Sequence, residues 1–178
     1  MISLGICLSF FYIFSACEIK KKSTENTTTT SQESQISPSI KEHKLPSISG
    51  INHKGEAVDI SKIKAKYILL EFWASWCPPC RQFSPELVSI YKEFQPKGFE
   101  ILSISLDKDE SKWKQAITQD NLYWSNHLCE FKGWESEWAM QFHIEEIPNS
   151  VLFDDKGNVI ASHLSGEELR QKLSELLK

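Results

Sequence analysis

The sequence has little excess charge of either sign, which argues against a nucleic-acid-binding protein. Its 178 residues contain 20 Lys and Arg side chains against 24 Asp and Glu side chains, a formal net charge of −4. Nucleic-acid-binding proteins normally present a strongly basic face to the phosphate backbone, and this composition gives no sign of one. The length and the 40% hydrophobic content suit one globular domain with extensions.

The sequence also lacks an apolar run long enough to span a bilayer comfortably. Residues 1–16 carry no charged side chain, but they fall short of the about 20 residues that a membrane-spanning helix needs. We interpret them as a signal peptide, with an uncleaved N-terminal anchor or a mis-called start codon as the alternatives. Ser15-Ala16-Cys17 resembles a bacterial lipoprotein cleavage site, which implies a lipid on Cys17 and a domain tethered to the membrane in the extracytoplasmic, periplasmic part of the cell envelope.

Apolar side chains are absent from the stretch 23–35, which is rich in Ser and Thr. Such a stretch cannot bury enough surface to offset the entropy of ordering. Residues 17–41 are therefore predicted to be a flexible tether, and residues 42–178 to form the folded domain.

Two of the five cysteines lie where a strand pattern gives way to a helix pattern. The run 67–73 is apolar except for Glu71, as is typical of a strand buried on both faces. Beyond the cysteines, apolar side chains recur at three- and four-residue steps: Phe83, Leu87, Ile90, Tyr91 and Phe94. Cys77 and Cys80 would thus meet across the first turn of a helix, whose N–H groups favour a thiolate. Such a pair can shuttle between dithiol and disulfide.

The surrounding residues resemble the active-site stretch of the thioredoxin superfamily. The likeness consists of Trp73-Ala74-Ser75-Trp76-Cys77-Pro78-Pro79-Cys80, of Pro85, and of Ile147-Pro148, which resembles the family's cis-proline loop. The Cys-Pro-Pro-Cys form and the long segment before Pro148 are similar to TlpA/ResA-like thiol–disulfide oxidoreductases, from about Leu45 to the end of the chain. The resemblance implies an α/β thioredoxin-like fold: a central mixed β-sheet flanked by helices, an N-terminal β-hairpin, and an insertion before the cis-Pro strand.

Local patterns predict the elements of this fold. Ile48, Ile51, Val58 and Ile60 surround a turn at 52–55 and indicate the hairpin. Further strands are expected at 99–106 and on both sides of the turn 154–158, and helices at 107–119 and 167–177. Within the segment 121–140, we expect Trp124, Trp134 and Trp138 to pack an inserted helix onto the domain; a substrate-facing cluster is the alternative.

The resemblance also implies roles for residues. Cys77 would attack a substrate disulfide and Cys80 would resolve the mixed disulfide. The residues expected to contact substrate are Trp76, Pro78, Pro79 and Ile147, with Pro148 beside the cysteines. Because both prolines lack an N–H group, the Cys77 thiolate has few donors, which favours a reductant over a strong oxidant. A permanent structural disulfide is the alternative.

Carboxylates near the pair depart from the nearest family pattern. Glu71 lies six residues before Cys77, where burial would raise its pKa and allow proton exchange with Cys80. A purely structural carboxylate is the alternative. Glu145 and Glu146 precede Ile147 and either disfavour a thiolate nearby or are solvated loop charges.

Cys129 is the remaining cysteine of the domain. We expect an ordinary, partly buried side chain. The alternatives are a third redox participant and, as the minor one, a zinc ligand with His127, Cys77 and Cys80, because His127-Leu128-Cys129 is not a zinc knuckle. No metal or other cofactor is expected.

These observations predict a membrane-tethered, monomeric thiol–disulfide oxidoreductase. Its partners would be disulfide-containing proteins, for instance during cytochrome c maturation, and an electron donor in the membrane or periplasm. The alternatives are a peroxiredoxin-like peroxide reductase, which would not need a CxxC pair, and a non-catalytic binding domain, which would not need either cysteine.

Overall fold

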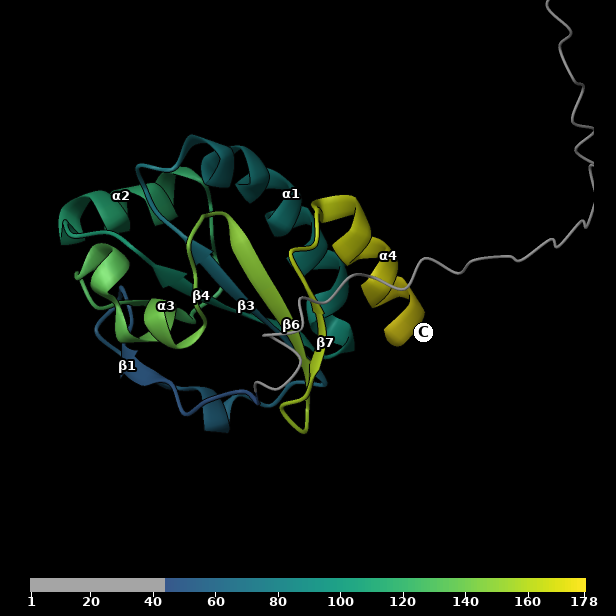
Figure 1. The fold of residues 1–178 in the computed structure, drawn as a ribbon. Coiled ribbons are helices and arrows are strands. Elements are labelled where there is room, and N and C mark those ends of the chain that lie inside the picture. Colours follow the sequence, from purple (N-terminus) through teal and green to yellow (C-terminus); the bar gives the residue numbers. More distant parts are fainter. Residues whose placement is uncertain (1–43) are drawn as a thin grey trace, which may run out of the picture. The chain divides into compact units, whose positions relative to one another are not determined.

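A five-stranded mixed sheet forms the centre of the part of the chain that the computed structural model describes, residues 44–178 (Figure 1). The strand order is β5-β4-β3-β6-β7. The strands are β3 (Tyr67–Trp73), β4 (Phe99–Ser105), β5 (His127–Cys129), β6 (Asn149–Asp154) and β7 (Val159–Ser162). β3 pairs in parallel with β4 and antiparallel with β6. Six of its seven residues are buried, which confirms the expected central strand.

Helices lie on both faces of this sheet. They are α1 (Pro78–Phe94), α2 (Glu110–Gln119), α3 (Glu137–Gln141) and α4 (Gly166–Leu176). α1 links β3 to β4 and α2 links β4 to β5, both between parallel neighbours and in the same direction. Right-handed crossovers therefore put α1 and α2 on one face, and α4 packs against α1 there.

The opposite face belongs to α3. Phe142, which directly follows this helix, lies against Phe72 and Phe153, with ring centroids 5.7 and 6.1 Å away. Because side chains alternate along a strand, Glu71 then faces the side of α1 and α2. The ring of Trp124 lies on that same side, 5.3 Å from the ring of Tyr91 in α1.

The predicted hairpin is confirmed as β1 (Ser49–Ile51) and β2 (Ala57–Asp59), which pair antiparallel. Three short 3-10 turns complete the fold: η1 (Ile60–Lys62), η2 (Gln95–Lys97) and η3 (Gly133–Glu135). Of the four apolar residues that indicate the hairpin, Ile51 is 61% exposed, whereas Ile48, Val58 and Ile60 are buried. Alternation along β1 turns Gly50, rather than Ile51, toward Leu128 of β5.

The segment 121–140 differs from the single inserted helix that the sequence suggests. It contains β5 and η3 ahead of α3, so the sheet has one strand more than predicted. The packing role is confirmed for Trp124, which is 2% exposed, and for the partly buried Trp138. It is wrong for Trp134, which is 44% exposed.

α2 begins at Glu110, three residues later than predicted. The Asp109 side chain accepts a hydrogen bond from the Lys112 N–H at 3.1 Å, so Asp109 caps the helix. The predicted signal peptide, the predicted lipid site at Cys17 and the predicted tether fall on residues outside those that the structure describes. Within residues 44–178 no helix combines the length and the apolarity that crossing a membrane requires.

Candidate active site

The two cysteines lie where β3 turns into α1. Cys77 is the N-cap of this helix, Pro78 and Pro79 form its first two positions, and Cys80 completes the first turn. The Cys80 N–H donates to the Cys77 sulfur at 3.2 Å. The sulfurs are joined in a disulfide, with the two Cα atoms 5.3 Å apart. The structure thus holds the pair in its oxidised form at a helix N-terminus.

The Ile147-Pro148 segment lies opposite the cysteines, as the resemblance implies. Its peptide bond is cis, an isomer that the sequence alone does not determine. β6 follows immediately and pairs with β3, Asn149 opposite Phe72. This pairing brings the Ile147 carbonyl oxygen to 3.8 Å from the Cys77 sulfur.

The two cysteines are less accessible than the residues around them. Cys77 is 3% exposed and Cys80 is 1% exposed, so both are buried. Trp76 is 52% exposed, and Pro78 and Pro79 are exposed beside it. A substrate would meet these side chains before it reached the Cys77 sulfur.

Glu71 is buried in β3, as predicted. It is 3% exposed, and desolvation raises the pKa of its carboxyl group to about 7. One hydrogen bond opposes the shift: the Ser103 hydroxyl donates to Glu71 Oε2 at 2.6 Å. Trp124 Nε1 in turn donates to the Ser103 oxygen at 3.0 Å. The carboxyl group can therefore gain or lose a proton near neutral pH.

Glu71 belongs to a buried polar row that sequence reasoning missed. Ser150, Glu71, Ser103 and His127 lie opposite one another on four adjacent strands. All four are buried. Burial lowers the pKa of His127 to about 3, so this side chain stays neutral, and its ring stacks on Trp124 with centroids 5.1 Å apart. Only the alignment of the strands brings these residues together, and no local motif signals it.

A second missed feature holds the loop before Cys77. The Asp107 carboxylate accepts the Ser75 N–H at 2.9 Å and also the hydroxyl groups of Ser75 and Ser105. Arg81 donates to the Ser75 carbonyl at 3.2 Å and forms a two-point ion pair with Asp120, just beyond α2. Polar side chains thus clamp the loop from two sides.

The remaining predicted side chains lie around or away from the pair. Glu145 and Glu146 are exposed in the loop before Ile147. Cys129 is a partly buried free thiol, as expected. Its sulfur contacts the Asp107 carbonyl and the Phe131 N–H, each at 3.4 Å, and burial raises its pKa to about 11.

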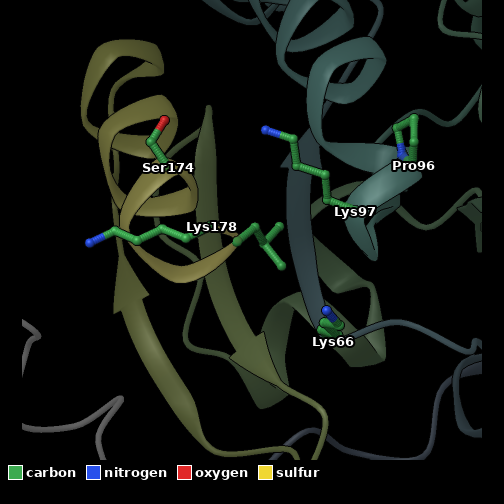
Figure 2. A pocket seen from close by; sticks show the side chains of 6 residues that line it. Lys66, Pro96, Lys97, Ser174 and Lys178 are labelled. Atoms are coloured by element: carbon green, nitrogen blue, oxygen red, sulfur yellow. The ribbon is translucent and has the colours of Figure 1, made fainter.

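A surface hollow of about 500 Å³ lies far from this chemistry (Figure 2). Its lining residues come from the end of the chain and the region of η2: Lys66, Pro96, Lys97, Ser174, Leu177 and Lys178. Lys66 directly precedes β3, whereas the cysteines follow its other end. The hollow is therefore separate from the cysteine site.

Comparisons with known proteins agree with this geometry. A family model described as thioredoxin-like matches residues 65–159, a range that contains Cys77, Cys80 and Pro148. The chain is 29% identical over 125 residues to the thiol-disulfide oxidoreductase ResA of Bacillus thuringiensis subsp. konkukian, which covers 70% of this chain and 69% of that one.

Solved structures show the same likeness. A thiol-disulfide oxidoreductase from Bacteroides fragilis superposes with a TM-score of 0.70 at 39% identity, over 76% of this chain and 100% of that one. A thiol:disulfide interchange protein from Bacteroides sp. gives a TM-score of 0.68 at 32% identity, over 75% and 88%.

The raised pKa of Glu71 predicts a pH-dependent loss of stability. A carboxyl group with a pKa of about 7 when folded and about 4.5 when unfolded keeps its proton longer in the folded state. Stability therefore falls as the pH rises between these values. Glu71→Gln has no such proton to lose. We expect the free energy of unfolding of the oxidised wild type, measured with urea, to fall by about 2 kcal/mol relative to that of Glu71→Gln between about pH 5 and about pH 8.

The matched control is Glu145→Gln, the same substitution at an exposed loop position. It should change the free energy of unfolding by less than about 0.5 kcal/mol. Equal pH dependence in wild type and Glu71→Gln would show that the buried carboxyl group does not titrate in this range.

Proposed function

The chain belongs to the thioredoxin-like family and is a thiol–disulfide oxidoreductase of the TlpA/ResA type, and we propose that it reduces disulfide bonds in other proteins. The observation that carries the proposal is the Cys77–Cys80 disulfide at the N-terminus of α1, with the Ile147 carbonyl 3.8 Å from the Cys77 sulfur. Although both cysteines are buried, Cys77 directly follows the exposed Trp76, so a substrate would reach Cys77 first, whereas Cys80 lies one turn into α1.

The proposed reaction starts from the reduced pair. The Cys77 thiolate attacks one sulfur of the substrate disulfide, whose S–S bond breaks as a mixed disulfide forms. The other substrate sulfur leaves as a thiolate and takes up a proton. Cys80 loses its proton and attacks the Cys77 sulfur, which forms the Cys77–Cys80 disulfide and releases the second substrate thiolate. The substrate gains two electrons and two protons, which a dithiol electron donor must then return to the enzyme.

The surroundings of the pair support the reducing direction. A strong oxidant needs a thiolate that its protein stabilises well. In the first turn of α1, Pro78 and Pro79 have no N–H to offer, and one donor, the Cys80 N–H, reaches the Cys77 sulfur. The carboxylates of Glu145 and Glu146 precede Ile147 and oppose negative charge in this region.

Glu71 supports the second step. Its carboxyl group titrates near pH 7 on the face of the sheet that α1 covers, and Cys80 is the buried cysteine of that helix. We propose that the ionised Glu71 accepts the proton of Cys80 as this sulfur attacks the mixed disulfide. General bases of this kind work best when their pKa lies near the operating pH.

The N-terminal residues support an extracytoplasmic location. We propose that residues 1–16 direct export, that Cys17 carries a lipid, and that residues 17–41 connect the membrane to the catalytic domain. The enzyme would then meet proteins that acquire disulfides outside the cytoplasm.

Reduction of insulin tests the reaction, with the mixed disulfide between the enzyme and an insulin chain as the intermediate that is followed. The reduced wild type should cleave insulin disulfides with little accumulated intermediate, whereas Cys80→Ala should stop at a covalent complex through Cys77. Glu71→Gln retains Cys80, and its mixed disulfide should be resolved roughly tenfold more slowly near pH 7 than that of the wild type. This effect is smaller than many general bases contribute, because Cys80 can also lose its proton to water. Quenched-flow samples on non-reducing gels measure both steps.

Cys77→Ala is the control and should form no complex. Reduction of peroxide but not of insulin would contradict the proposed function. Equal resolution rates in wild type and Glu71→Gln at all pH values would instead make Glu71 a structural residue.

Expression of the full chain in a bacterium tests the location. Cys17→Ser should move the protein from the membrane fraction to the soluble extracytoplasmic fraction, because it removes the thiol to which the lipid is attached. The mass of the wild-type N-terminal peptide should include the lipid. Unchanged membrane attachment of the variant would contradict lipidation at Cys17.

A further inference from the structure

Two exposed tryptophans from distant parts of the chain lie together, and one of them is the residue before Cys77. Trp76 directly precedes Cys77, and Trp134 lies in η3 of the inserted segment. Their ring centroids are 6.3 Å apart, and the side chains are 52% and 44% exposed. Trp73, Trp113 and Trp124, in contrast, are at most 2% exposed. Exposure of neighbouring large apolar side chains beside a reactive group is typical of a binding surface.

The protein holds Trp134 in place through its neighbours. Gly133 has a positive φ of 63°, and a Cβ atom there would lie 2.5 Å from the Lys108 side chain. Ser136, on the other side, is buried and donates a hydrogen bond to Glu130 at 2.6 Å. These contacts position the short turn that carries Trp134, and the Trp76 ring is the neighbour of its side chain.

Exposed carboxylates next to Trp134 in the chain, and just before Ile147, whose carbonyl contacts the Cys77 sulfur, favour a cationic ligand. Glu135 follows Trp134, and Glu145 and Glu146 precede Ile147; all three are exposed and have no ion-pair partner among residues 44–178. The Lys132 side chain forms ion pairs with Glu130 and Glu137. Lys108, an exposed lysine beside Gly133, forms no ion pair within residues 44–178, so three such carboxylates stand against one such lysine. Carboxylates that lack partners around an aromatic pair attract Lys and Arg side chains.

We propose that Trp76 and Trp134 bind the polypeptide that carries the disulfide, and that the preferred substrate is an unfolded segment with an aromatic side chain and a Lys or Arg next to its cysteine. The inference rests on the proposed function and specifies its substrate class. An unfolded segment is required because Cys77 is only 3% exposed. A cysteine on a flexible chain reaches this sulfur while its neighbours lie against the two rings.

The test compares two synthetic peptides, each with one intramolecular disulfide. Phe and Lys flank the cysteines in one, and Ser and Glu flank them in the other. With the Phe/Lys peptide, Trp134→Ala in the full chain should raise KM about tenfold and change kcat by less than about twofold, because it removes binding rather than chemistry. Trp134→Phe should restore most of the loss. Wild type should prefer the Phe/Lys peptide about tenfold or more in kcat/KM.

Met140→Ala is the matched control, since Met140 is 55% exposed in α3 and has no part in the proposed surface. It should leave KM for both peptides unchanged. Hydroxyethyl disulfide, a small uncharged substrate, separates the two hypotheses. Its reduction by a wild type that reduces neither peptide would contradict the proposed function itself. Peptide reduction with equal KM values in wild type and Trp134→Ala, or with no preference between the peptides, would overturn the inference and leave the proposed function standing.

Discussion

The Cys77 sulfur is held between the first turn of α1 and the carbonyl oxygen of Ile147, and the rest of the structure serves this double contact. β3 makes it possible, because one of its ends continues into α1 while its antiparallel edge pairs with β6, the strand that follows Ile147-Pro148. Asp107 and Arg81 hold the intervening loop through Ser75. A shift of β6 by one residue along β3 would turn its buried side chains to the other face and separate the two halves of the site.

The inserted segment acts on both sides of the cysteine pair. In the interior it supplies Trp124, which donates to Ser103 and so supports the hydrogen bond that Glu71 accepts. At the surface it supplies Trp134 beside Trp76. Burial of a carboxyl group costs free energy that a single hydrogen bond only partly offsets. Such a cost is common where a site trades stability for function, and the apolar packing around β3 outweighs it.

Much of this architecture follows from local sequence patterns, because they extend over many residues. The long apolar run of β3, the helical spacing of α1 and the turn between β6 and β7 predict their elements within a few residues. β5 escapes prediction because it has three residues and gains its stability from pairing with β4. The polar row, the loop clamp and the exposure of Trp134 depend on which strands and turns become neighbours in space, and no local pattern contains that information.

The environment of Cys77 stabilises its thiolate only weakly, so the dithiol form of the Cys77–Cys80 pair should give up its electrons readily, as a reductant does. Equilibration of the described domain's disulfide with defined mixtures of reduced and oxidised dithiothreitol or glutathione, followed by counting of free thiols, measures the reduction potential directly. The sparse donors around Cys77 predict a potential near that of thioredoxin, about −270 mV. A potential near that of a strong oxidant, about −120 mV, would contradict the account.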